Sequence, residues 1–376
     1  MRGAILTYRI KVLKIQLKGV LKLEKRIVCL AGDGVGPEVM ESAKEVLHMV
    51  ERLYGHHFHL QDEYFGGSAI DLNGQPLPQR TLAACLASDA VLLGAVGGPR
   101  WDSAKERPEK GLLALRKGLG VFANVRPVTV ESATAHLSPL KKADEIDFVV
   151  VRELTGGIYF SYPKERTDEV ATDTLTYHRH EIERIVSYAF QLASKRKKKV
   201  TSIDKANVLE SSKLWRTVTE EVALRYPDVE LEHILVDAAA MELIRNPGRF
   251  DVIVTENLFG DILSDEASVL AGSLGMLPSA SHAEKGPSLY EPIHGSAPDI
   301  AGKNKANPIA MMRSVAMMLG QSFGLTREGC AIEEAISAVL KLGKCTADIG
   351  GAETTTSFTK AVMQEMEEQA LVGRGR

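Results

Sequence analysis

The stretch Arg26-Ile-Val-Cys-Leu-Ala-Gly-Asp-Gly-Val-Gly-Pro-Glu38 decides the fold class of this chain. Its apolar residues 27–31 predict a buried strand, the glycine-rich part that follows predicts a turn, and residues 37–54 have the spacing of an amphipathic helix. Pro37 stands where the first helical turn begins, a position that proline favours. A strand, a tight turn and a helix in this order are the unit from which α/β folds are built.

The glycines of this turn do not form a dinucleotide-binding fingerprint. The G-x-G-x-x-G pattern requires a third glycine where this chain has Pro37. We therefore interpret the turn as a strand-to-helix connection, and a conventional Rossmann domain is not supported.

The same alternation continues along the chain. Buried strands are predicted at residues 90–94, 148–152, 200–204, 231–236 and 251–255, and helices at 181–194, 213–226, 308–319 and 332–342. This order predicts a sheet that is largely parallel or mixed. The 376 residues exceed what one hydrophobic core usually serves, so we expect two domains.

Composition excludes several classes of protein. The chain is 44% apolar and 25% charged with a formal net charge of -3, values typical of a globular protein without a global positive field for nucleic acid or anionic membranes. No apolar run reaches the roughly 18 residues of a membrane-spanning helix. The four cysteines form no C-x-x-C pair, which favours a reducing compartment and a cytoplasmic location.

Two basic segments have alternative interpretations. Residues 1–23 carry lysine and arginine and no acidic residue, which is compatible with a targeting peptide. Basic residues interrupt each apolar stretch, and serine and arginine are sparse, so we assign residues 1–24 as a non-essential extension or a choice of start site. The run 195–199 is interpreted as the solvated end of a helix rather than a nucleic-acid surface.

Two carboxylates give the strongest chemical signal. Asp261 and Asp265 lie four residues apart in Asn257-Leu-Phe-Gly-Asp-Ile-Leu-Ser-Asp265 and therefore share one face of a predicted helix. Such oxygen ligands suit Mg²⁺ or Mn²⁺, whereas the alternative is a solvated acidic face. Asp237 is a third candidate ligand, and its alternative role is N-cap of a helix over residues 238–244.

Other side chains suit anion binding and proton transfer. Arg116, Arg126 and Arg152 stand beside predicted turns, and guanidinium groups bind carboxylates at two points, although a structural ion pair is the alternative for each. Tyr159 and Lys205 can carry protons, and their alternatives are a core tyrosine and a surface lysine.

A long loop is the candidate cofactor site. Residues 291–308 combine turn-forming residues with hydrogen-bonding side chains, which is common in functional loops. The amides of Gly295 and Ser296 suit phosphate oxygens, and Asp299 suits ribose hydroxyls while repelling a 2′-phosphate, which favours NAD over NADP. His294 has no cysteine or histidine partner at the spacing of a zinc site.

Four motifs together resemble the β-decarboxylating dehydrogenase family, which includes isopropylmalate, isocitrate, homoisocitrate and tartrate dehydrogenases. These motifs are Gly32-Asp-Gly-Val-Gly-Pro-Glu38, Val151-Arg-Glu-Leu-Thr-Gly-Gly-Ile-Tyr159, the Asn257 to Asp265 run and His294-Gly-Ser-Ala-Pro-Asp-Ile-Ala-Gly302. The resemblance covers residues 26–358. It implies a two-domain α/β fold with a mixed sheet and without the Rossmann topology. Residues 25–121 and 275–376 would form a cofactor-binding domain that contains both termini, and residues 122–274 a central domain for substrate, metal and dimerisation.

The resemblance also implies roles for individual residues. It assigns a substrate-carboxylate clamp to Arg116, Arg126 and Arg152, Mg²⁺ or Mn²⁺ ligation to Asp237, Asp261 and Asp265, NAD binding to His294, Gly295, Ser296, Ala297, Asp299 and Asn307, and catalysis to Tyr159 and Lys205. A homodimer is implied in which Lys205, Asn207 and Asp237 reach the partner subunit's site. One departure from the family pattern is Ala239, where a methionine is expected.

Within the family, the segment Glu109-Lys-Gly-Leu-Leu-Ala-Leu-Arg116 is similar to the isopropylmalate type. Its Glu109, Leu112 and Leu113 would line a pocket for an isopropyl group, and a leucine wall would leave the third carboxylate of isocitrate unpaired. The reaction implied is the NAD-linked oxidative decarboxylation of 3-isopropylmalate to 4-methyl-2-oxopentanoate in leucine biosynthesis. A tartrate- or malate-type dehydrogenase and a non-catalytic regulatory subunit are the alternatives, and the presence of all catalytic groups disfavours the second.

Overall fold

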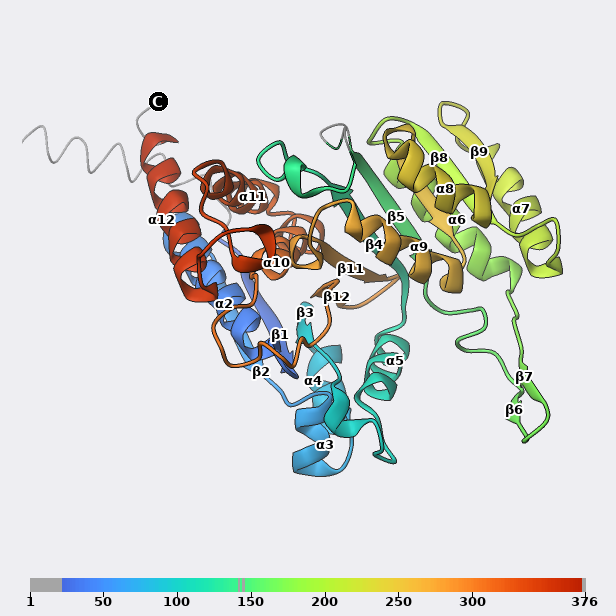
Figure 1. Cartoon of the computed structure of the whole chain (residues 1–376), viewed down its shortest axis with the longest axis horizontal. Helices are drawn as coiled ribbons and strands as arrows, with labels where there is room; N and C mark the ends of the chain where they lie inside the picture. The colour runs from blue at the N-terminus through green and yellow to red at the C-terminus, as the bar shows by residue number, and fades with distance from the viewer. Residues whose placement is uncertain (1–21, 141–142, 144–145, 374–376) are drawn as a thin grey trace, which may run out of the picture.

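A ten-stranded mixed sheet with helices on both faces forms the centre of the molecule (Figure 1). The computed structural model describes residues 22–140, 143 and 146–373, so residues 1–21 of the predicted extension lie outside the described part. The strand order is β2-β1-β3-β12-β11-β4-β5-β10-β8-β9. The strands are β1 Glu24–Gly32, β2 His57–Asp62, β3 Ala90–Ala95, β4 Val121–Thr129, β5 Asp147–Glu153, β8 Lys199–Asp204, β9 Glu230–Leu235, β10 Val252–Thr255, β11 Pro278–Ala283 and β12 Ser288–Pro292.

The sheet consists of two parallel halves that run in opposite directions. Strands β2, β1, β3 and β12 are mutually parallel, as are β5, β10, β8 and β9. Between the halves, β11 pairs antiparallel with β12 and β4, and β4 pairs antiparallel with β5. The predicted mixed sheet is therefore confirmed.

One register row crosses all ten strands. It passes through Asp62, Cys29, Leu92, Tyr290, Ala280, Val125, Val151, Val254, Ser202 and His233. Because the pairing is continuous, the positions of residues in the two halves are fixed relative to each other by backbone hydrogen bonds.

Helices cover both faces of each half. The half at the left of Figure 1 carries α2 Gly36–Tyr54, α3 Gly67–Asn73, α4 Gln79–Leu86, α5 Pro108–Leu119, α10 Ile309–Gln321, α11 Thr326–Lys341 and α12 Thr355–Gly373, and the other half carries α6 Arg179–Ala193, α7 Glu210–Ala223, α8 Val236–Arg245 and α9 Asn257–Val269. In β1, Ile27 and Cys29 belong to one hydrophobic cluster, and Val28 and Leu30 to another. Successive strand residues thus bury opposite faces, as expected for a sheet covered on both sides.

A short hairpin projects away from the main sheet (Figure 1). Its strands β6 Lys164–Arg166 and β7 Ala171–Asp173 pair antiparallel, and all six residues are exposed. Polar residues in an isolated pair of short strands gave no alternating apolar pattern, so the hairpin was not predicted from the sequence.

Two local expectations are wrong. Helix α8 begins at Val236, so Asp237 lies in its first turn and is not the N-cap, which is Leu235. Arg126 lies inside β4 rather than beside a turn. Pro127 suggested the turn, but the pairing of β4 with β11 ends at Val125, so proline stands where the strand has a neighbour on one side only.

The basic run 195–199 follows α6, which ends at Ala193, and its last residue, Lys199, begins β8. Arg196 forms ion pairs with Asp147 and Asp251, and Lys199 with Glu230 and Glu232. Its charge is therefore compensated within the chain. Among the described residues, no helix is both long and apolar enough to cross a membrane.

Candidate active site

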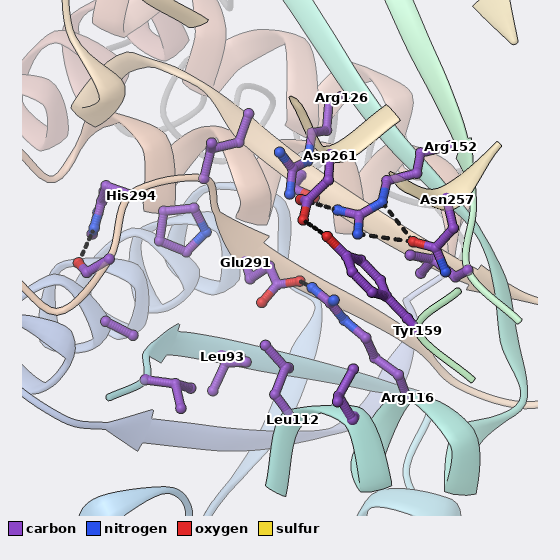
Figure 2. A pocket seen from close by; sticks show the side chains of 18 of the residues that line it. Leu93, Leu112, Arg116, Arg126, Arg152, Tyr159, Asn257, Asp261, Glu291 and His294 are labelled. Carbon is purple, nitrogen blue, oxygen red and sulfur yellow. Dashed lines mark hydrogen bonds and ion pairs between the residues drawn. The ribbon is translucent and has the colours of Figure 1, made fainter. Parts of the chain in front are cut away.

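The two halves of the sheet meet at a pocket of about 310 Å³ (Figure 2). It is lined from one half by the end of β3, α5 and the residues after β12, and from the other by β4, β5, the following turn and α9. The lining includes Leu112, Leu113, Arg116, Arg126, Arg152, Tyr159, Asp261, His294 and Gly295. Residues predicted from motifs as much as 180 positions apart are thus brought together.

Arg152 is the most deeply buried of the three predicted arginines. Its side chain is 3% exposed and makes hydrogen bonds from Nε and Nη2 to Asn257 Oδ1, at 3.0 and 2.9 Å, and from Nη1 to Asp261. Burial and the charges of Arg126 and Arg116 lower the pKa of Arg152 to about 10, against the opposing effect of Asp261. The group therefore stays cationic at neutral pH.

Helix α9 approaches Arg152 closely because residue 260 is glycine. A Cβ at Gly260 would lie 2.7 Å from Cγ of Arg152. The glycine in the Asn257 to Asp265 motif thus allows Asn257 and Asp261, one helical turn apart, to bind the same guanidinium group.

Arg126 and Arg116 hold separate acidic partners. Arg126 Nη1 donates to Asp265 Oδ1 at 2.8 Å and to Ser264 Oγ at 2.7 Å. Arg116 Nη2 donates to Glu291 Oε1 at 2.8 Å, and both of these side chains are 11% exposed. Each arginine enters the pocket already oriented by a fixed partner.

The phenol of Tyr159 faces the carboxylate of Asp261. Its hydroxyl donates to Asp261 Oδ2 at 2.7 Å. Burial and the carboxylate of Asp261 raise the pKa of Tyr159 to about 12, so the phenol remains protonated at neutral pH. Burial opposes ionisation of Asp261, but Arg152 and the Tyr159 hydroxyl together lower the pKa of this carboxyl.

The two predicted helix carboxylates share a face of α9 but differ in exposure. Asp261 is 34% exposed and lines the pocket, whereas Asp265 is 65% exposed and lies at its edge, bound to Arg126. Within the described residues, no three carboxylate, histidine or cysteine side chains converge as a metal-binding group. Asp237, the third predicted ligand, does not converge with Asp261 and Asp265 in this structure.

Lys205, Asn207 and Asp237 lie outside this pocket. Lys205 Nζ donates to Asp237 Oδ1 at 2.6 Å, and Asn207 is exposed in the turn after β8. This ion pair lowers the pKa of the Asp237 carboxyl. The three residues form a second group at the surface, at the ends of β8 and β9.

The predicted cofactor residues lie in three places. His294 and Gly295 line the pocket, while Ser296, Ala297 and Asp299 continue along the loop beyond it. Burial lowers the pKa of His294, which keeps its imidazole neutral. Asn307 is buried instead, donating to Asp348 Oδ2 at 3.0 Å and accepting from the Ile309 amide at 3.0 Å.

Comparison with known proteins decides the family. The model for isocitrate/isopropylmalate dehydrogenases matches residues 26–364. The chain belongs to this family. It is 99% identical over 354 residues to the 3-isopropylmalate dehydrogenase of Bacillus cereus, and the aligned residues cover 94% of this chain and 100% of the relative. It is 61% identical over 344 residues to the 3-isopropylmalate dehydrogenase of Listeria monocytogenes, covering 91% of this chain and 98% of the relative.

Solved structures of the isocitrate/isopropylmalate dehydrogenase family have the same architecture. An isocitrate dehydrogenase from Methylococcus capsulatus aligns with a TM-score of 0.83 at 34% identity, covering 91% of this chain and 99% of that chain. A β-decarboxylating dehydrogenase from Thermococcus kodakarensis aligns with a TM-score of 0.78 at 36% identity, covering 92% and 96%. The family and the fold expected from the motifs are therefore confirmed.

The segment that resembled the isopropylmalate type of this family forms one wall of the pocket. Leu112 and Leu113 of α5 line it, whereas Glu109 in the first turn of α5 is exposed and does not. Glu109 instead lies beside Gly97, where a Cβ would be 2.6 Å from Glu109 Oε1. At the departure from the family pattern, Ala239 is fully buried in α8.

Sequence reasoning missed Asn257 and Glu291. Both occur at the start of motifs that were recognised, and both bind an arginine of the pocket. The available signal was a polar residue at the end of an apolar strand. Asn257 follows β10, which ends at Thr255, and Glu291 is the second-last residue of β12. Their partners are 105 and 175 positions away, so no local spacing reveals the pairs.

Glu256, which precedes α9, gives a test by pH. Its side chain is buried, and burial together with the charge of Asp204 raises its pKa to about 7, although Ser212 Oγ donates to it. The unfolded state ionises near 4.5, so the native state loses stability as pH rises from about 4.5 to 7. Glu256→Gln removes this ionisation. The unfolding free energy of the variant should therefore rise relative to that of wild type by about 3 kcal/mol between pH 4.5 and 8, as measured by urea titrations. The exposed Glu284→Gln is the control, and a gain independent of pH would contradict this account.

Proposed function

We propose that this chain catalyses the NAD-dependent oxidative decarboxylation of (2R,3S)-3-isopropylmalate to 4-methyl-2-oxopentanoate and CO₂, a step of leucine biosynthesis. The observation that carries the proposal is a pocket in which Arg116, Arg126 and Arg152 face a wall formed by Leu112 and Leu113. Guanidinium groups bind the two carboxylates of such a substrate, and the leucines cover its isopropyl group. The relatives named above support the same substrate.

The residues divide the chemistry between them. The arginines hold the carboxylates and fix the orientation of the C2 hydroxyl. Lys205 of the partner subunit, as the neutral amine, accepts the proton of this hydroxyl while hydride leaves C2 for NAD, which gives a β-keto acid. After CO₂ is lost, Tyr159 donates its phenolic proton to the resulting enolate carbon, and the high pKa of Tyr159 ensures that this proton is present.

A divalent cation, Mg²⁺ or Mn²⁺, fits the oxygen-only donor set of Asp261 and Asp265 together with Asp237 of the partner subunit. The three arginines of the pocket are balanced by the three carboxylates of Asp261, Asp265 and Glu291. A substrate with two carboxylates and a divalent cation would bind together without changing this balance. When bound, the cation polarises the C2 oxygen and stabilises negative charge on it.

For NAD, we propose the loop that follows β12. Gly295 and Ser296 offer main-chain amides to phosphate, Ala297 lies next to them, and Asp299 is exposed for ribose hydroxyls. His294 is neutral and borders the pocket, where the nicotinamide must meet C2. Asn307 lies at the end of this segment, where it forms hydrogen bonds with Asp348 and with the first residue of α10.

We infer that the functional unit is a homodimer with shared sites. Lys205, Asn207 and Asp237 lie at the surface, and exposed apolar side chains are found nearby on α8 and α9. These are Met241, Ile244, Ile262 and Val269, exposed by 64, 48, 59 and 56%. An apolar surface of this kind is typical of an interface, and a partner seated there places its Lys205 group near the pocket.

The proposed domain organisation and location follow from the same assignments. Residues 25–121 and 275–376 carry the cofactor loop, and residues 122–274 carry Asp261, Lys205 and the exposed apolar surface. Cys29 and Cys85 are buried free thiols, which supports a reducing, cytoplasmic environment.

Substrate preference tests the proposal. We expect NADH formation with 3-isopropylmalate, with kcat/KM about 30-fold above that for D-malate, because burial of three carbons contributes about 2 kcal/mol. Preference over isocitrate is expected to exceed 100-fold, because a third carboxylate meets Leu112 and Leu113 without a partner. Chelation of divalent cations by EDTA is expected to abolish the activity, and Mg²⁺ or Mn²⁺ to restore it.

Other results of this assay would favour one of the alternative functions. Preferred turnover of D-malate or isocitrate would keep the family but refute the substrate. No turnover by a folded, metal-loaded dimer would instead support a regulatory subunit.

A further inference from the structure

The glycine turn between β1 and α2 is tied to the cofactor loop, which we define as residues 294–302. The Val35 amide donates to the carbonyl oxygen of Ser296 at 2.8 Å. The Gly302 amide donates to Glu38 Oε1. Val35 in this turn and Glu38 at the start of α2 therefore anchor two points of a loop that lies more than 250 positions later in the chain.

Direct contact between the main chains explains a glycine in this turn. Gly34 has φ 58°, and a Cβ there would lie 1.9 Å from the carbonyl oxygen of Ser296. No other residue type fits without moving the loop. The 32–38 motif, which did not match a dinucleotide fingerprint, thus contacts the loop that carries the candidate cofactor residues.

The loop contains a strained residue between its two anchors. Ala297 has φ 39°, a left-handed conformation that is unfavourable for a non-glycine residue. Such a conformation persists only where the surroundings enforce it. Ser296 is 8% exposed, whereas Ala297 and Asp299 are exposed, so the anchored residue is buried and the following residues are open to solvent.

The carboxylate of Glu38 accepts a single hydrogen bond from the described part of the chain. Its Oε1 accepts from the Gly302 amide, and its Oε2 is buried without a hydrogen-bond partner among those residues. No cation of the described residues forms an ion pair with it. Its charge therefore acts on the loop amide, and a hydrogen bond to a charged group is roughly twice as strong as a neutral one.

We propose that Glu38 is a positioning residue for the dinucleotide. Together with Gly34 and Val35, it holds the cofactor loop in the strained shape that presents Asp299 and the amides of Gly295 and Ser296. This inference rests on the proposed function, because it assigns the loop to NAD. Glu38 itself touches neither substrate nor the reacting atoms.

The test compares Glu38→Ala, Glu38→Gln and the exposed Glu41→Gln of the same helix in the full-length enzyme. We expect Glu38→Ala to raise KM for NAD about tenfold, while kcat and KM for 3-isopropylmalate stay within about twofold. Glu38→Gln keeps an acceptor for the Gly302 amide, so it should restore most of the affinity, and Glu41→Gln should match wild type. Hydrogen exchange of residues 296–302 without cofactor should quicken in Glu38→Ala only.

Four outcomes would overturn the inference. An unchanged KM for NAD in folded Glu38→Ala, or unchanged hydrogen exchange, refutes positioning by Glu38 while wild-type NAD reduction leaves the proposed function intact. Equal losses in all kinetic parameters with a lowered melting temperature would show a merely structural role. If the wild-type enzyme does not reduce NAD, the proposed function fails first, and the assignment of the loop to NAD fails with it.

Discussion

Heterodimers that pair a Lys205→Met subunit with a Tyr159→Phe subunit are expected to recover about half of the wild-type turnover, although each variant homodimer is nearly inactive. Removal of either proton-transfer group should lower kcat by about 10²–10⁴-fold. Tyr159 lines the pocket and Lys205 does not, so in the homodimer proposed above each site would combine Tyr159 of one subunit with Lys205 of its partner. One of the two sites in the heterodimer then retains both groups.

The experiment requires co-expression with two different affinity tags, so that heterodimers are purified before NADH formation is measured. Lys213→Met is the matched control, because Lys213 lies exposed on α7 and pairs only with neighbouring Glu210 in the described structure. It should retain wild-type turnover. If both groups of a site came from the same chain, each site of the heterodimer would carry one defect and turnover would stay at the level of the homodimers.

Replacement of Arg152 by lysine is expected to lower kcat/KM for 3-isopropylmalate by about 10²–10³-fold. A lysine cannot reproduce the planar group that binds Asn257 through Nε and Nη2 and Asp261 through Nη1. Lysine keeps the positive charge but loses the paired hydrogen bonds to buried Asn257, and a buried acceptor left without a donor costs about 1–3 kcal/mol of stability. Steady-state kinetics and thermal unfolding of the same preparations measure both effects.

Arg179→Lys provides the control for this substitution. Arg179 lies at the start of α6, is 52% exposed and pairs with Glu221, so its replacement should change kcat/KM and the melting temperature little. Wild-type kinetics in Arg152→Lys would show that the guanidinium group does not bind substrate. Lost stability with unchanged kinetics would assign Arg152 a structural role.

Much of the fold could be predicted because its central strands are short apolar runs. The prediction at 148–152 falls inside β5, and that at 200–204 inside β8. Helix α11 begins at Thr326, six residues before its predicted start at 332, since Glu333 and Glu334 imitate an acidic first turn. Strand β11 carries Ser279 and Ser281, which are buried by tertiary contacts that an apolar pattern does not reveal.

The candidate site was predictable as a set of residues but not as a set of pairs. Carboxylates four residues apart on a helix, such as Asp261 and Asp265, repel each other unless a cation lies near them. In the structure, Arg152 binds one and Arg126 the other, so repulsion alone does not require a metal. These arginines are 109 and 139 positions away in the chain, and only the assembled sheet places them beside α9.

The register row across the sheet limits where residues can be inserted into or deleted from this sequence. Arg152, Glu291 and Ser279 each lie one position from the row, on strands of both halves. An insertion or deletion of one residue within β5, β11 or β12 would shift the following side chains by about 3.3 Å and turn them to the opposite face. Variation in length is therefore confined to segments outside these strands, such as the turn of the β6–β7 hairpin, where no pocket residue depends on the register.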